Sequence, residues 1–120
     1  MDDLARWLGE QFDEDERIAR AADPGPWKSE SLGRHDQAAI KPAAPTSLIQ
    51  FDGSRAAANG VHAARHNPAR VLREIEAKRR IVDRYEWLRE HGDTGGTAWV
   101  LPLLALPYAD RPGFREEWRP

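Results

Sequence analysis

The sequence contains no cysteine among its 120 residues. Disulfide-stapled folds, thiol catalysis, iron–sulfur clusters and cysteine-ligated zinc sites are therefore excluded. Leu, Ile, Val and Phe are scarce as well, because together they fill only 22 positions. Such a low fraction is typical of disorder when the net charge is large, and here the net charge is only −2. Since five tryptophans add apolar surface, we expect a small folded domain with a thin core.

The sequence also lacks an apolar run of the length that a transmembrane helix needs. Its longest run, Ala98 to Leu106, is interrupted by Pro102 and falls far short of the ~20 residues that span a bilayer. The N-terminus is acidic where a secretory signal is basic, and no apolar stretch follows it. We therefore expect a cytoplasmic protein that makes no contact with a membrane.

The near-zero net charge conceals two segments of opposite charge. Residues 1–23 hold eight acidic and three basic residues, whereas residues 54–91 hold nine basic and five acidic ones. The basic segment either faces solvent, where it can bind a charged partner, or packs against the acidic segment. The sequence pI of about 6.1 is well below the values typical of nucleic-acid-binding domains.

The apolar pattern predicts one α+β domain that is mostly helical and spans the whole chain. Apolar residues recur every three or four positions over 1–22 and over 68–91, which predicts two long amphipathic helices. A short alanine-rich helix is expected over 55–66, and a helical or turn segment over 98–118. Short runs broken by Gly, Pro and Asp predict a small antiparallel hairpin or meander at 27–53.

Residues that favour helix N-caps stand at the start of three predicted helices. Asp2 or Asp3 can cap the first helix, and Ser54 can cap the alanine-rich one. Asn67 followed by Pro68 is the clearest boundary, because Asn is a good N-cap and Pro suits the first helical position.

Three blocks of the sequence resemble a family of short proteins with no established activity. They are MDDLARWLGEQFDEDERIARAADPGPW (residues 1–27), AARHNPARVLREIEAKRR (63–80) and LALPYADRPGFREEWRP (104–120). The resemblance implies an origin in Streptomyces-like actinobacteria, often on prophages or other mobile elements. It implies no substrate, cofactor or catalytic residue.

The loop from Gly92 to Thr97 departs from the pattern of that family. Many of the similar proteins carry a short cysteine-rich insert here, which would suit a structural zinc ion. This loop contains no cysteine, so it cannot bind zinc in the same way. We expect packing, with Trp99 as the candidate side chain, to hold the loop instead.

Two histidines provide a pattern suited to a metal ion. His62 and His66 stand four positions apart on a predicted helix, which places both imidazoles on one face. A zinc site needs at least one more ligand, which must come from elsewhere in the chain. The candidates are His35, Asp36, Glu74 and His91. The alternative is a pair of surface histidines without a metal, so we expect no cofactor, although zinc remains open.

The basic segment offers a second candidate site, for nucleic acid. Arg65, Arg70, Arg73 and Lys78 lie where a helix-turn-helix would place contacts to phosphate groups. The alternative is a solvated face on which these cations pair with nearby carboxylates or with the acidic first helix.

Taken together, these patterns favour a non-enzymatic interaction or regulatory module that binds a protein partner. The candidate partner surfaces are an acidic stretch in the first helix and a basic face of the long helix. Their residues are Asp13, Glu14, Asp15, Glu16, Arg73, Arg80 and Arg84. A nucleic-acid-binding accessory protein is the second interpretation, and a metal-dependent enzyme is the third. Apolar stripes on two long helices also allow a homodimer.

Overall fold

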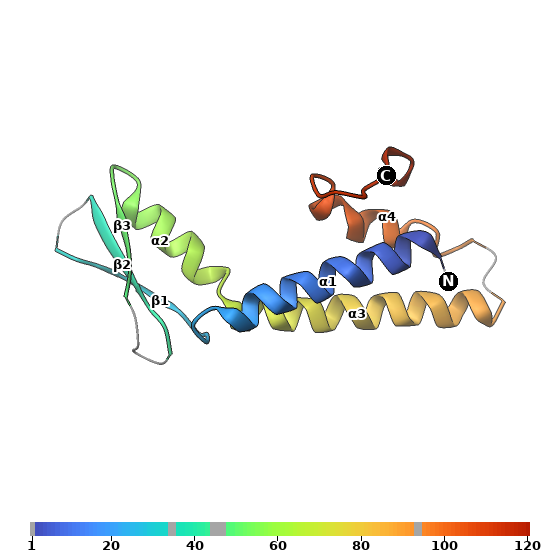
Figure 1. Cartoon of the computed structure of the whole chain (residues 1–120), viewed down its shortest axis with the longest axis horizontal. Helices are drawn as coiled ribbons and strands as arrows, with labels where there is room; N and C mark the ends of the chain where they lie inside the picture. Colours follow the sequence, from blue (N-terminus) through green and yellow to red (C-terminus); the bar gives the residue numbers. More distant parts are fainter. Residues whose placement is uncertain (1, 34–35, 44–47, 93–94) are drawn as a thin grey trace. The chain divides into compact units, whose positions relative to one another are not determined.

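The computed structural model describes residues 2–33, 36–43, 48–92 and 95–120. The fold is α+β and mostly helical, as predicted, with a three-stranded antiparallel sheet (Figure 1). Its elements are α1 (Asp3–Ala21), β1 (Lys28–Ser31), β2 (Gln37–Lys41), β3 (Ile49–Asp52), α2 (Ala56–Arg65), α3 (Pro68–Glu90), α4 (Val100–Ala105) and 3-10 turns at Leu106–Tyr108 and Glu116–Trp118. Within these residues, no helix has both the length and the apolar character needed to cross a membrane.

The chain forms two compact units. The helical unit comprises Met1–Asp15 and Ile75–Pro120, and the sheet unit comprises Glu16–Glu74. Helices α1 and α3 therefore each contribute residues to both units. The expectation of a single domain over the whole chain stays a prediction.

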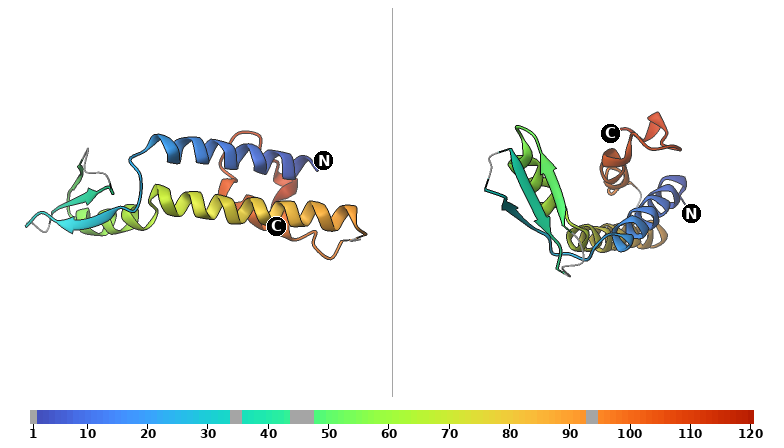
Figure 2. Two further views of the ribbon diagram at one scale, coloured as in Figure 1. Left: turned by 90° about the horizontal axis from the view of Figure 1, so that it is seen from below. Right: turned by 60° about the vertical axis from the view of Figure 1, so that its left-hand side comes forward.

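In the sheet unit, α2 covers one face of the sheet (Figure 2). The strands lie in the order β1-β2-β3, and β2 is the buried centre with Ala38, Ala39 and Ile40 fully covered. Gly60 allows α2 to approach this closely. A Cβ atom added there would lie 2.9 Å from the Ser29 hydroxyl oxygen and 3.4 Å from the Ala38 methyl carbon. The glycine that weakens α2 as an isolated helix is thus required by its packing.

The helix caps agree with the sequence prediction at two of three positions. The Asp2 carboxylate accepts the Leu4 N–H at 2.8 Å and caps α1. The Asn67 side-chain oxygen accepts the Ala69 N–H at 2.9 Å and caps α3. The prediction for Ser54 is wrong, because α2 begins later and Arg55 occupies the N-cap position with no side-chain hydrogen bond.

In the helical unit, the N-terminal part of α1 lies beside the C-terminal part of α3 (Figures 1 and 2). Leu8 and Phe12 of α1 and Leu101 of α4 are fully buried there. Trp7 fixes the C-terminal tail, because its indole N–H donates to the Pro112 carbonyl at 3.2 Å. The Trp7 ring also packs against Trp118, with ring centroids 5.5 Å apart. Such aromatic contacts give a small domain a large share of its buried apolar surface.

Candidate functional site

The two histidines considered as candidate metal ligands are both exposed, His62 on α2 and His66 at the C-cap of that helix. The rings of His62 and His66 have centroids 4.4 Å apart. The Nδ1 of His66 lies 2.8 Å from the His62 carbonyl oxygen, so that nitrogen carries the proton and is turned toward its own helix. No three His, Asp or Glu side chains gather as a metal site within the described ranges. The candidate ligand Glu74 pairs with Arg70, and His35 lies outside the described residues.

The acidic stretch of residues 13–16 lies in the middle of α1, which continues through it without a break. Asp13 pairs with Arg79 of α3 at 2.8 Å, and Asp15 pairs with Arg111 of the C-terminal tail at 2.8 Å. The acidic helix and the basic helix therefore meet within the helical unit. Asp13 and Asp15, two of the acidic residues predicted to bind a partner, therefore form ion pairs within the unit.

The four residues proposed to contact nucleic acid differ in their surroundings. Arg70 pairs with Glu74 at 2.7 Å, and the Lys78 ammonium donates to the Tyr108 hydroxyl at 2.9 Å. These two cations are half-buried and already bonded within the chain. The exposed members are Arg65 and Arg73.

Arg80 and Arg84 lie on the face of α3 that also carries Arg73, since offsets of seven and eleven residues are close to whole helical turns. They stand beside an apolar hollow that the sequence did not reveal. The hollow has a volume of about 270 Å³. Its lining, besides the two arginines, is Ile81, Tyr85, Leu88, Thr97 and Val100. Arg80 pairs with Glu76 at 2.8 Å, and the Arg84 guanidinium lies 4.6 Å from the centre of the Trp87 ring. We call this feature the α3 hollow.

The outer side of α4 carries a second exposed apolar feature in the same unit. Trp99, Leu103 and Leu106 follow one another at helical spacing and are 63%, 50% and 43% exposed. The opposite side of the same segment is buried, through Leu101, Ala105 and Tyr108. We call the three exposed residues the α4 stripe. This short helix is apolar on both sides, and its own unit buries only one of them.

Sequence reasoning predicted only a helical or turn segment here and did not separate the two sides of the apolar run from Ala98 to Leu106. The signal was present, since the run holds two apolar sets at helical spacing, and a single core can bury only one of them. The expectation that packing of Trp99 holds the loop before it is wrong, because this side chain is 63% exposed; its indole N–H instead donates to the Gly96 carbonyl at 3.0 Å. Asp93 and Thr94 of that loop lie outside the described residues.

Comparison with curated proteins and with solved structures gave no match to this chain. A family of unknown function, DUF6221, matches it over residues 1–120. This match agrees with the resemblance seen in the three sequence blocks, and it brings no activity, ligand or partner. The chain belongs to the DUF6221 family.

Proposed function

We propose that this protein is a non-enzymatic interaction module whose helical unit binds an amphipathic, acidic segment of a partner protein. The observation that carries the proposal is the α3 hollow, an apolar depression edged by Arg80 and Arg84 in the same unit as the exposed α4 stripe. Exposed apolar side chains that form one patch on a folded protein mark a surface where a partner binds.

The apolar part of this surface favours a partner helix. Trp99, Leu103 and Leu106 present side chains with the spacing that complements a helix or an extended apolar edge. Fully burying one such side chain is worth about 1.5–3 kcal/mol. Tryptophan is also enriched among the residues that contribute most to protein interfaces.

The charged part of the surface favours acidic groups on that partner. Arg84 contacts the face of Trp87, and the ion pair of Arg80 is exposed and therefore weak. Both guanidinium groups can bind a carboxylate of an incoming segment. A second copy of this chain is a poorer occupant, because a two-fold interface sets the patch against itself, and the described lining of the α3 hollow holds two arginines and no carboxylate.

The test uses two synthetic helical peptides that share one set of leucines at positions i, i+4 and i+7. The leucines are flanked by Glu in one peptide and by Lys in the other. We expect the Glu-flanked peptide to bind, with affinity measured by fluorescence anisotropy, and the Lys-flanked peptide to bind at least about tenfold more weakly. Leu103→Gln and Arg84→Gln should each weaken binding of the Glu-flanked peptide. Val61→Gln, which changes an exposed apolar residue of the sheet unit, is the matched control.

Two results would overturn the proposal. One is equal binding of both peptides, and the other is undiminished binding by the Leu103 variant. Salt-sensitive binding of a DNA duplex that Arg65→Ala and Arg73→Ala abolish, with no peptide binding, would favour the nucleic-acid interpretation instead. A cytoplasmic location and an origin on an actinobacterial prophage or mobile element belong to the same proposal, because they rest on the sequence and its resemblance.

A further inference from the structure

The helical unit holds a second depression, on another face of α3. This groove lies between α1 and α3 and has a volume of about 420 Å³, within the range of small-ligand sites. Residues 79, 82, 83 and 86 of α3 line it, whereas residues 80, 81, 84, 85 and 88 line the α3 hollow. At 3.6 residues per turn these two sets point to different sides of the helix. We call this depression the α1–α3 groove.

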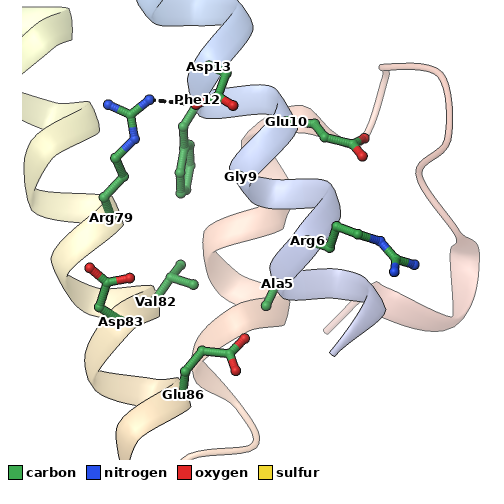
Figure 3. A pocket seen from close by; sticks show the side chains of 10 residues that line it. All are labelled: Ala5, Arg6, Gly9, Glu10, Phe12, Asp13, Arg79, Val82, Asp83 and Glu86. Carbon is green, nitrogen blue, oxygen red and sulfur yellow. Dashed lines mark hydrogen bonds and ion pairs between the residues drawn. The ribbon is translucent and has the colours of Figure 1, made fainter. Parts of the chain in front are cut away.

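The floor of the α1–α3 groove is apolar. Phe12 and Val82 lie between the two helices, and Ala5 lies lower on α1 (Figure 3). Gly9 stands at the centre of the α1 face that forms the wall, one turn from Ala5 and one turn from Asp13. A Cβ atom added at Gly9 would meet no atom within 4 Å. Gly9 makes α1 less stable than alanine would, and no close packing contact with the described residues requires it. The absence of a side chain at this position leaves the groove open.

The wall of the groove is predominantly acidic. Four carboxylates line it, at Glu10, Asp13, Asp83 and Glu86, against two guanidinium groups. Asp13 is neutralised by its ion pair with Arg79, which is drawn in Figure 3. For Glu10, Asp83 and Glu86 no ion pair occurs among the residues that the structure describes. The groove therefore retains an excess of negative charge.

Glu86 shows where a ligand would bond. Its side chain extends from α3 toward α1 (Figure 3). Its Oε1 atom is buried and accepts no hydrogen bond within the described part of the chain. A buried carboxylate oxygen without a donor costs about 1–3 kcal/mol or more, which a bound N–H group would recover. The missing partner is a hydrogen-bond donor, and the surrounding charge favours a cationic one.

We propose that the α1–α3 groove binds a small organic cation, an alkylammonium or alkylguanidinium group on a short apolar stem. The stem contacts Val82 beside the gap at Gly9, above the buried Phe12 ring, and the cationic head donates to the Glu86 carboxylate. This site is independent of the partner surface proposed above, because it uses another face of α3 and no residue of the α4 stripe.

The test is a titration of the full chain with butylguanidinium and butylammonium, followed by the backbone amide shifts of residues 5–13 in two-dimensional NMR. Pentanamide and pentanoate, of similar length but neutral and anionic, are the comparison ligands. We expect saturable shifts centred on Gly9 with the cations, and binding at least about tenfold weaker with the other two.

Three variants locate the site. Glu86→Gln should weaken cation binding about tenfold while preserving side-chain shape. Gly9→Leu should abolish binding by filling the groove, and it should fold well because the position is open. Glu90→Gln removes an exposed carboxylate one turn further along α3 and outside the groove, so it should bind as the parent does. Equal binding of amide and cation, or unchanged binding by Glu86→Gln or Gly9→Leu, would falsify the proposal.

Discussion

At the scale of single residues, Asp2 links two helices through one carboxylate. Its Oδ1 accepts the Leu4 N–H and caps α1, while its Oδ2 accepts the Tyr85 hydroxyl of α3 at 3.3 Å. The cap could be predicted, since Asp before an apolar period is a common helix start. The bond to Tyr85 could not, because those residues are 83 positions apart in sequence.

Tyr85 makes this link sensitive to alkaline pH. Burial raises the pKa of Tyr85, the negative charge of Asp2 raises it further, and Arg89 opposes both. As the pH rises, the tyrosine of the unfolded chain therefore ionises first. Its contribution to the free energy of unfolding is complete below about pH 10, the ordinary pKa of tyrosine, and is lost as the pH rises through the raised value.

We accordingly expect Tyr85→Phe to lower the free energy of unfolding by about 1 kcal/mol at neutral pH, because a hydrogen bond to a carboxylate is lost. Above about pH 10 the difference between the two proteins should shrink, since only the parent loses stability through this group. Urea unfolding at pH values on both sides of 10 measures this difference. A constant difference across that range would contradict the assignment.

At the scale of elements, two helix glycines have opposite roles. Gly9 of α1 faces open space, whereas Gly60 of α2 is pressed against the sheet beside Ser29. From sequence alone both read as weak points, because glycine costs a helix about 1 kcal/mol relative to alanine. Only the packed structure distinguishes the glycine that the fold requires from the one that it does not.

Gly9→Ala should therefore raise the free energy of unfolding by about 0.5–1 kcal/mol. Gly60→Val should lower it by about 1–3 kcal/mol, because its Cβ would meet the Ser29 hydroxyl at 2.9 Å. Chemical denaturation of the two variants beside the parent measures both changes. In the double variant Ser29→Ala with Gly60→Ala, the contact is relieved, so this protein should be more stable than Gly60→Ala alone. A stabilised Gly60→Val protein would show that α2 does not pack closely on the sheet.

At the scale of the whole molecule, some of the acidic and basic side chains form ion pairs with one another within the helical unit. Asp13 and Asp15 of α1 are held by Arg79 and Arg111, so the acidic stretch is partly neutralised within the helical unit. The surface left for recognition is apolar and arginine-edged on one face of α3, and acidic on another. The near-zero net charge of the chain is thus a sum that includes a basic surface and an acidic surface on different faces of α3.

This distribution predicts the state of association. A two-fold dimer through the α3 hollow would set this patch against itself, and its lining, among the residues that the structure describes, holds two arginines and no carboxylate, so we expect a monomer of 13.6 kDa at micromolar concentration. Light scattering on a sizing column measures the mass directly. A mass twice as large, returned to the monomer value by Leu103→Gln, would instead assign the α4 stripe to a homodimer, the association that the apolar stripes of the long helices also allow.

The helices and the strand region of this protein could be predicted from local sequence patterns. Apolar spacing and caps such as Asn67 predicted the long helices to within two residues, and Gly, Pro and Asp punctuation predicted the meander, because these are local properties of the chain. The absence of cysteine likewise excluded whole classes of site without any coordinates.

Which side chains are buried or paired within the units, and which stay exposed, became visible in the folded structure alone. Trp99 and Leu103 belong to the longest apolar run of the sequence, yet they are exposed, because the other side of α4 is the one that packs into its unit. Glu86 looks like one more surface carboxylate on a basic helix, yet one of its oxygens is buried without a donor. Burial and pairing depend on contacts between residues distant in sequence, and no local pattern encodes them.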